Sequence, residues 1–240
     1  LAGYATWQGV PAASRENLAR LAVVLDRLIA EYGLDALAIR CWTELQSELG
    51  ISPCVVMSIL NETGTAAACE VDVGNAVMMR ALQLASGRPV ALLDWNNNYG
   101  DADDKCILFH CSAVPAALMT EPGRIEDHPM LARVVGDGCS YGCNAGRLAP
   151  TDFTFGGLMT QAGRVRTYLG HGRITGEPIA PEFFGCAGVA QIDRLQDVLL
   201  HIGRTGQRHH VAVAPGLCQA PLCEALGYYL GYEVCVPQGA

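Results

Sequence analysis

Six side chains with acid, base or metal-binding chemistry share one feature: each stands at the end of a short apolar segment. They are Glu70, Asp72, Asp94, His110, His209 and His210. Unpaired carboxylates are costly to bury, so these acids must reach solvent or face a positive charge. Mixed carboxylate and imidazole ligands suit Mn²⁺ or a similar divalent ion better than an ion that prefers thiolates. We therefore expect a divalent-metal site with the ligands Glu70, Asp94, His110, His209 and His210.

Each of these residues also has a structural interpretation. His110 could be a satisfied core histidine, and His209 and His210 could simply begin a strand. Asp72 shares a strand face with Glu70 if the strand continues, and it could then orient a metal ligand. We favour instead a role for Asp72 as the N-cap of the helix that follows.

Aromatic and amide side chains near the same segment ends could hold a polyhydroxylated ligand. Trp42, Trp95 and Asn96 are the expected substrate-binding residues, because an indole offers a flat apolar face and an amide offers hydrogen bonds. The alternatives are a core tryptophan and a turn asparagine.

The eleven cysteines are scattered along the chain, and many lie inside apolar runs such as "CILFHC". Free cysteine is usually a small buried hydrophobic residue, so we expect reduced thiols and a cytoplasmic protein. Cys139 and Cys143 have a C-x3-C spacing without a second close pair, which speaks against structural zinc. Cys111 beside His110 is a weak sign of a cysteine nucleophile.

The chain of 240 residues carries a formal net charge of -8. Binding to nucleic acid or to an anionic membrane needs clustered Lys and Arg, so we expect neither, and a small molecule as the partner. No window reaches the roughly 18 continuous apolar residues of a membrane span, and no secretion signal opens the sequence. The first residue is Leu1 rather than Met, which suggests a piece of something longer or a processed start.

The N-terminal segment predicts one amphipathic helix. From Ser14 to Tyr32 apolar residues recur at intervals of three and four, with Ser14 placed as a cap and Gly33 as the end. The predicted buried stripe consists of Leu18, Leu21, Leu25, Leu28 and Tyr32.

The next segment alternates between strands and helices. A helix from about Ser52 to Gly64 follows the strand-like run "LDALAIRC". A strand over Ala66 to Glu70 precedes a helix over Asn75 to Ala85, with Gly74 as the break, and "RPVALLD" predicts a third strand that ends at Asp94. Crossover helices imply a parallel sheet, whose strands end at one common edge where ligands bind. The acids would then gather at that edge.

Beyond about residue 100, short strands separated by glycines favour an antiparallel arrangement such as a small barrel. The segments "FTFGGLMT", "GRVRTYLGHGRI" and "HHVAVAP" are expected strands, 136–146 a loop, and 193–203 and 221–230 helices. The predicted fold class is α/β: a parallel α/β sheet segment, as at the end of a Rossmann-like domain, followed by a mostly antiparallel, barrel-like C-terminal domain with helices. The predicted domains are 1–86, with a boundary as late as 102, and 87–240.

Several motifs occur in the order found in one enzyme superfamily. They are "CWTEL", "GISPCVVMSILNETGTAAACEVDVGNAVMM", "PVALLDWNN" and "ILFHCSAVP", followed by the "HH" pair. In this order they resemble the metal-dependent ketol isomerases of the L-fucose isomerase and L-arabinose isomerase superfamily. The similarity runs from about Asp35 to about Val213, and "LAPTDFTFGGLMTQAGRVRTYLGHGRI" is similar to the C-terminal domain of that family.

The resemblance implies a metal-dependent aldose–ketose isomerase of carbohydrate metabolism that uses Mn²⁺ or another divalent ion. Glu70 and Asp94 would act on either side of an open-chain sugar and transfer a proton between C2 and C1. The family also implies a homo-oligomer and further N-terminal domains, which this chain would lack. The alternatives are a non-catalytic sugar-binding protein, a metal-dependent lyase or aldolase, and a cysteine-based redox or zinc module.

Overall fold

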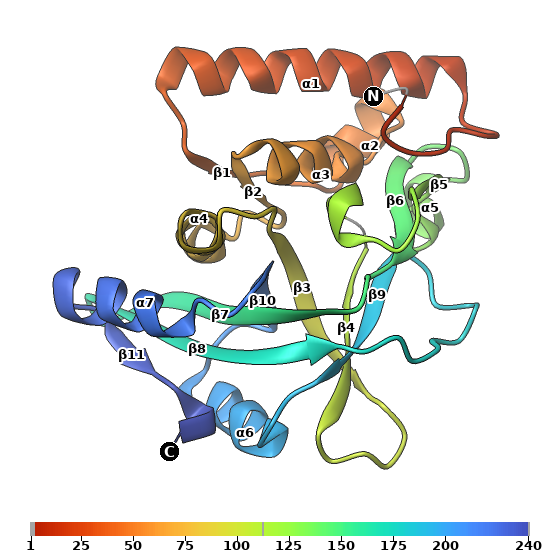
Figure 1. Cartoon of the computed structure of the whole chain (residues 1–240). Helices are drawn as coiled ribbons and strands as arrows, with labels where there is room; N and C mark the ends of the chain where they lie inside the picture. The colour runs from red at the N-terminus through yellow and green to blue at the C-terminus, as the bar shows by residue number, and fades with distance from the viewer. Residues whose placement is uncertain (1–2, 112, 240) are drawn as a thin grey trace.

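A computed structural model of the protein describes residues 3–111 and 113–239. Figure 1 shows two stacked parts, with the N-terminal helices and a small sheet above and a larger, strongly twisted sheet below. The small sheet is a parallel pair, and six strands of the larger sheet close into an antiparallel barrel. The predicted fold class, a parallel α/β segment followed by a barrel-like part, is confirmed.

The α/β part consists of two short strands surrounded by helices. Its parallel strands are β1 (Ala36–Ala38) and β2 (Ala66–Ala68). Its helices are α1 (Ala12–Tyr32), α2 (Glu44–Leu49), α3 (Cys54–Thr63) and α4 (Val73–Ser86). All of β2 is buried, because α3 and α4 both pack against this strand.

The barrel is built from six antiparallel strands. They are β3 (Ala91–Asn98), β4 (Lys105–His110), β7 (Thr151–Gln161), β8 (Arg164–Ile174), β9 (Cys186–Gln191) and β10 (His210–Pro215). Their order is β8-β7-β10-β3-β4-β9, and pairing of β9 with β8 closes the ring. Leu93, Phe155 and Tyr168 belong to the apolar cluster that fills the interior. Closure leaves none of these six strands as a free edge of the ring.

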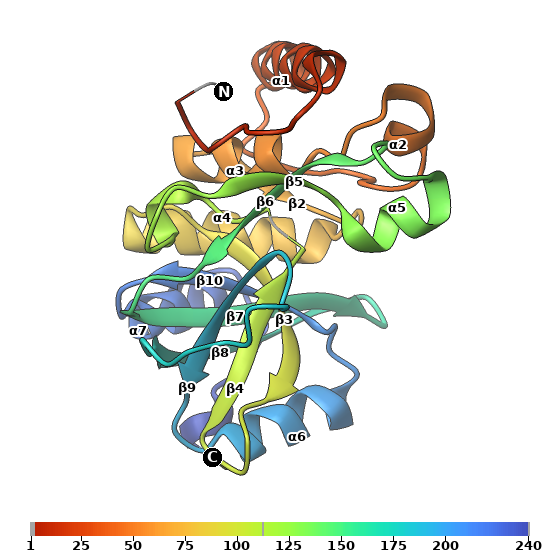
Figure 2. The same cartoon turned by 90° about the vertical axis from the view of Figure 1, so that its right-hand side faces the viewer.

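The remaining elements decorate the barrel and connect it to the α/β part. They are β5 (Arg124–Asp127), β6 (Tyr141–Arg147), β11 (Glu233–Cys235), α5 (Pro129–Val135), α6 (Leu195–Thr205), α7 (Gln219–Cys223), a π-helical turn (Glu224–Tyr229) and two 3-10 turns (Ala116–Leu118, Pro237–Gly239). Figure 2 shows β5 and β6 beside the N-terminal helices, above the barrel. Because β6 packs on α3 and also pairs with β9, it joins the two parts. The predicted division after residue 86 stays a prediction.

Helix α1 differs from its prediction in two respects. It begins after Pro11, so Ser14 lies inside the helix and does not cap it, whereas Gly33 ends the helix as predicted. Leu18 is fully buried, but Leu28 and Tyr32 are 38% and 66% exposed. With 3.6 residues per turn, the buried face of the helix runs from Leu18 to Ile29 and leaves Leu28 outside it. Ile29 packs on the core. The predicted stripe was therefore wrong at its C-terminal end.

The predicted third parallel strand is also wrong. Strand β3 does not end at Asp94, and its partners β4 and β10 are both antiparallel to it. The crossover argument fails because β3 leaves the α/β part and enters the barrel. Asp94 nevertheless faces the end of β2, for the different reason described below.

Two glycines that were expected in breaks or loops permit close packing instead. Gly74 lies in the first turn of α4, where an added Cβ would come within 2.5 Å of the carbonyl oxygen of Leu158 on β7. Gly142 lies in β6, where a Cβ would collide with the carbonyl group of Ser52. The predicted loop over 136–146 thus ends where β6 begins.

The eleven cysteines all lie within the described residues, and all are free thiols. Within the same ranges, no helix combines the length and apolar character that a membrane crossing requires.

Candidate active site

A strained turn between β2 and α4 presents the first candidate acid. Glu70 and Val71, neither of them glycine, both have a φ of 56°. L-residues rarely adopt this left-handed conformation, and strain of this kind tends to occur at functional sites. The turn directs the side chain of Glu70, which remains partly exposed, toward the first residue of β10.

The end of the turn is held by the cap of α4. The side chain of Asp72 accepts a hydrogen bond from the backbone N–H of Asn75, as predicted for an N-cap. The amide of Asn75 donates to Asp72 at 2.7 Å and accepts from the backbone N–H of Leu158 on β7. Because Gly74 has no side chain, α4 can approach β7 closely enough for this contact. These contacts attach the turn that carries Glu70 and Asp72, called the site turn below, to the barrel.

The register of the barrel places Asp94 and His210 side by side. The two residues are direct partners in the antiparallel pair of β3 and β10. Nδ1 of His210 lies 2.8 Å from Oδ2 of Asp72. Its other nitrogen, Nε2, lies 3.6 Å from Oδ1 of Asp94 and 3.8 Å from Oε2 of Glu70. Three carboxylates, two from the turn after β2 and one from β3, therefore surround one imidazole.

The pKa values in this cluster depend on burial and on neighbouring charge. Burial raises the pKa of Asp94 to about 6, the charge of Glu70 acts in the same direction, and the neighbouring histidines oppose it. Burial alone would lower the pKa of His210 and raise that of Asp72. The hydrogen bond between them, with the surrounding charges, reverses both effects, so the pKa of His210 is raised and that of Asp72 is lowered.

Two polar atoms at the centre of the cluster fit a metal ion. Within the described residues, Nε2 of His210 and Oδ1 of Asp94 are buried and have no hydrogen-bond partner. The ionised Asp72 accepts a hydrogen bond from the N–H group at Nδ1 of His210. In a neutral His210 the lone pair is therefore on Nε2, and it points at the carboxylates of Glu70 and Asp94. A carboxylate that orients a metal-binding histidine in this way is common in metalloproteins. A cation between His210, Asp94 and Glu70 would satisfy both atoms.

His209 and Arg208 lie at the outer side of the cluster. Nε2 of His209 is 3.5 Å from Oδ1 of Asp94, and its side chain is mostly exposed. Glu70, His209 and His210 each offer one ligand atom within 4.8 Å of the others. Arg208, also exposed, approaches Oδ1 of Asp72 at 3.6 Å and was not among the predicted residues. In the sequence, only the position of Arg208 directly before the histidine pair could have indicated that it lies at the site.

His110 lies on the inner side, beside a cysteine that the sequence reasoning missed. Nε2 of His110 is 2.9 Å from Sγ of Cys69, and its ring centroid is 6.0 Å from that of His210. Burial lowers the pKa of His110 to about 3, so its imidazole is neutral. Cys69, His110 and His210 are all buried and form a second group whose ligand atoms lie within 4.8 Å. No spacing in the sequence relates Cys69 to His110.

The three predicted substrate-binding residues have different surroundings. The indole of Trp95 packs edge-on against Phe155, and its Nε1 donates to the hydroxyl of Tyr168 at 3.0 Å, in the barrel interior. These contacts fit the core-tryptophan alternative, and the predicted substrate contact of Trp95 stays a prediction. Asn96 is exposed at a β-bulge in β3. Trp42 is 46% exposed and follows Cys41, whose thiol is hydrogen-bonded to Cys69.

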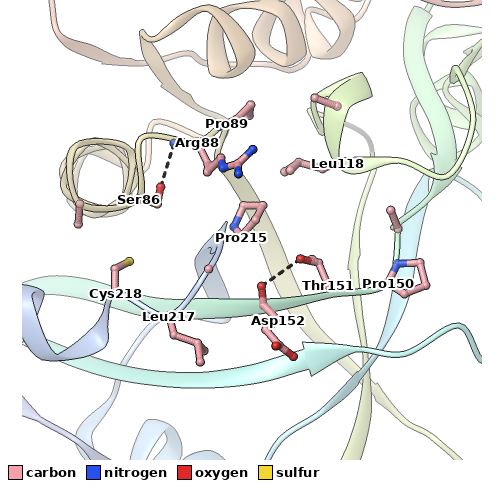
Figure 3. Close-up of a pocket in the computed structure, with 14 residues that line it drawn as sticks. Ser86, Arg88, Pro89, Leu118, Pro150, Thr151, Asp152, Pro215, Leu217 and Cys218 are labelled. Atoms are coloured by element: carbon pink, nitrogen blue, oxygen red, sulfur yellow. Dashed lines mark hydrogen bonds between the residues drawn. The ribbon is translucent and has the colours of Figure 1, made fainter.

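A cavity lies away from the candidate site. It has a volume of about 700 Å³ and is found at the other ends of β3 and β10, where Arg88 and Pro215 contribute to its lining. Figure 3 shows Arg88 and Asp152 among its polar side chains. None of the predicted site residues lines this cavity. The chemistry described above is therefore separate from it.

Comparison with known proteins gives a family match and several relatives. The model of the family described as "L-fucose isomerase, C-terminal domain" matches residues 108–237, which include His110, His209 and His210. A sulfoquinovose isomerase of Alkalicoccus urumqiensis is 31% identical over 137 residues, which cover 57% of this chain and 31% of that protein. A sulfoquinovose isomerase of Clostridium sp. (strain MSTE9) is 27% identical over 186 residues, 77% of this chain and 40% of that protein.

A third relative, a sulfoquinovose isomerase of Priestia megaterium, is 25% identical over 132 residues, 55% of this chain and 30% of that protein. The chain thus spans between 30% and 40% of the length of the curated relatives that it matches.

Proposed function

The chain belongs to the family of the L-fucose isomerase C-terminal domain, and from this premise we propose that it carries the catalytic site of a metal-dependent aldose–ketose isomerase. The proposal rests on two buried atoms of the described part of the chain that lack a hydrogen-bond partner. They are Nε2 of His210 and Oδ1 of Asp94, which face each other at 3.6 Å.

We assign Glu70, Asp94 and His210 as the residues that would hold the ion, with His209 at its outer side. Two carboxylates and an imidazole suit Mn²⁺ among the divalent ions. When bound, such an ion supplies a positive charge that stabilises the negative charge developing on the sugar oxygens, worth several kcal/mol. Asp72 holds Nδ1 of His210 and so keeps Nε2 aimed at the ion position.

We assign the proton transfer to the carboxylates of Glu70 and Asp94. One lifts the proton from C2 of the open-chain aldose and returns it to C1, and the other relays the hydroxyl proton. In the metal-free protein burial raises the pKa of Asp94 to about 6, so this carboxyl exchanges its proton near neutral pH. Glu70 approaches from the opposite segment and can reach the other side of the same substrate.

The substrate class is a reducing sugar in its open-chain form. The three relatives described above carry the name sulfoquinovose isomerase, so sulfoquinovose is the first sugar to test. The exposed guanidinium of Arg208 beside Asp72 supports an anionic substituent on the sugar. L-fucose and the pentoses are the neutral comparison set.

The test is a turnover assay of the full chain with Mn²⁺ and this panel of sugars. An isomerase converts an aldose into a ketose of unchanged mass, whereas a lyase or aldolase produces smaller fragments. Asp94→Asn and Glu70→Gln should each reduce turnover at least about 100-fold. Asp152→Asn, which alters an exposed acid remote from the site, is the matched control. Sugar binding without conversion, unchanged in Glu70→Gln, would favour the non-catalytic sugar-binding alternative.

A further inference from the structure

His210 belongs to two different groups of potential metal ligands. The outer group contains Glu70 and His209 and offers oxygen and imidazole ligands. The inner group contains Cys69 and His110 and offers a sulfur and a second imidazole. The members of the inner group come from three elements: Cys69 follows β2, His110 ends β4 and His210 begins β10.

The inner group has the geometry and the burial of a small metal site. Its three ligand atoms lie within 4.8 Å of one another, and its residues are at most 3% exposed. Ligand atoms bound tetrahedrally at zinc distances of about 2.0–2.3 Å lie roughly 3–4 Å apart. Small rotations of the side chains would therefore close the group around one ion.

The surroundings of the inner group are rich in sulfur. Cys41 is hydrogen-bonded to Cys69, and Cys111 lies 3.6 Å from Nδ1 of His110. Cys54 is hydrogen-bonded to Cys111, whose carbonyl oxygen accepts from the thiol of Cys143. A further thiol or a water molecule could thus complete a fourth position. Thiolate and imidazole ligands favour zinc-like ions over Mn²⁺.

We propose that Cys69, His110 and His210 form a second metal position that takes a thiophilic divalent ion, Zn²⁺ or Cd²⁺. Binding releases the thiol proton of Cys69 to solvent, and the resulting thiolate donates an electron pair to the ion. Because the ion also takes His210, it competes with an ion in the outer group. Zn²⁺ is thereby an inhibitor of the enzyme, a consequence that rests on the proposed function, whereas the binding itself does not.

The test uses the full chain after treatment with a chelator. Titration with Cd²⁺ should produce the sulfur-to-cadmium charge-transfer absorption in the ultraviolet, saturating at one ion per chain. Cys69→Ser should abolish this absorption, because a hydroxyl oxygen replaces the sulfur. Cys106→Ala removes another buried cysteine that lies in the barrel core, and should retain it. Circular dichroism establishes that each variant is folded.

A second pair of measurements separates the inner position from the outer one. His110→Gln should weaken Cd²⁺ binding at least about tenfold. This variant tests the inner position if Cys69→Ser does not fold. Asp94→Asn should retain the Cd²⁺ absorption but lose Mn²⁺ binding measured by electron paramagnetic resonance. No absorption in the unmodified chain, or full absorption in folded Cys69→Ser, overturns the inner site. Absorption that depends on Cys69 in a chain without sugar turnover leaves this site intact and removes only the isomerase.

Discussion

Nδ1 of His210 lies 2.8 Å from Oδ2 of Asp72, and each side chain is only 3% exposed. The same carboxylate caps α4 by accepting the backbone N–H of Asn75. One side chain therefore begins a helix and also sets the tautomer of the imidazole that we assign to the metal. The sequence offers the cap and the orienting role of Asp72 as alternatives, whereas the structure shows the cap together with a hydrogen bond to the imidazole.

Replacing Asp72 should separate these two functions. In Asp72→Asn the amide can still cap α4, but it is a weaker acceptor for the imidazole proton. We expect affinity for Mn²⁺ to fall about 10–100-fold with little change in the free energy of unfolding. In Asp72→Ala the free energy of unfolding should fall by about a further 1 kcal/mol, because the cap is lost. Calorimetry and urea denaturation measure the two effects, and unchanged Mn²⁺ affinity in Asp72→Asn would contradict the orienting role.

The raised pKa of Asp94 predicts how the stability of the metal-free protein depends on pH. Its folded pKa is about 6, above the ordinary value of 3.8, so the folded state binds this proton more tightly. The stabilisation is fully present below pH 3.8 and is lost as the pH rises through 6. Asp94→Asn lacks this titration. Relative to the unmodified chain, its free energy of unfolding should therefore increase between pH 4 and pH 7 by on the order of 2 kcal/mol.

This difference is measured by denaturing the unmodified chain and the Asp94→Asn variant in the presence of a chelator at several pH values. Parallel stability profiles for the two chains would show that Asp94 is not buried as described.

A pair of glycine substitutions tests the close packing of α4. An added Cβ at Gly74 would lie 2.5 Å from the carbonyl oxygen of Leu158, whereas Gly203 in α6 has open space around it. Gly74→Ala should lower the free energy of unfolding by about 1–3 kcal/mol and also weaken Mn²⁺ binding, because the site turn shifts. Gly203→Ala should raise the free energy of unfolding by up to about 1 kcal/mol. Equal effects of the two substitutions would refute the packing argument.

Trp95 should contribute to stability and not to sugar binding. Trp95→Phe removes the hydrogen bond to Tyr168 and part of the packing against Phe155. We expect the free energy of unfolding to fall by about 1–3 kcal/mol, while KM changes less than about twofold. Trp42→Phe, at an exposed position, should alter the free energy of unfolding by less than about 0.5 kcal/mol. A large rise in KM for Trp95→Phe would instead support the predicted substrate contact.

Local sequence patterns predicted the ends of several elements correctly. Gly33 and Gly64 each end a helix, and Asp72 caps α4, because these signals act over a few residues of the backbone. The prediction failed where a partner distant in sequence decides the structure. The local pattern predicts a break at Gly74, because nothing near it in the sequence indicates that α4 approaches β7.

The sequence by itself determined the family, through the order of its acid and histidine motifs, and the fold class, through its change from helical to glycine-separated strand patterns. It also determined that Glu70, Asp94 and the histidine pair were the residues to consider. Only the tertiary structure decided how they meet. Register pairs Asp94 with His210, a hydrogen bond between His210 and Asp72 ties β10 to the turn after β2, and Cys69 reaches His110 without any signal in their spacing. Proximity between residues more than 40 positions apart depends on strand pairing and packing, which local patterns along the chain do not encode.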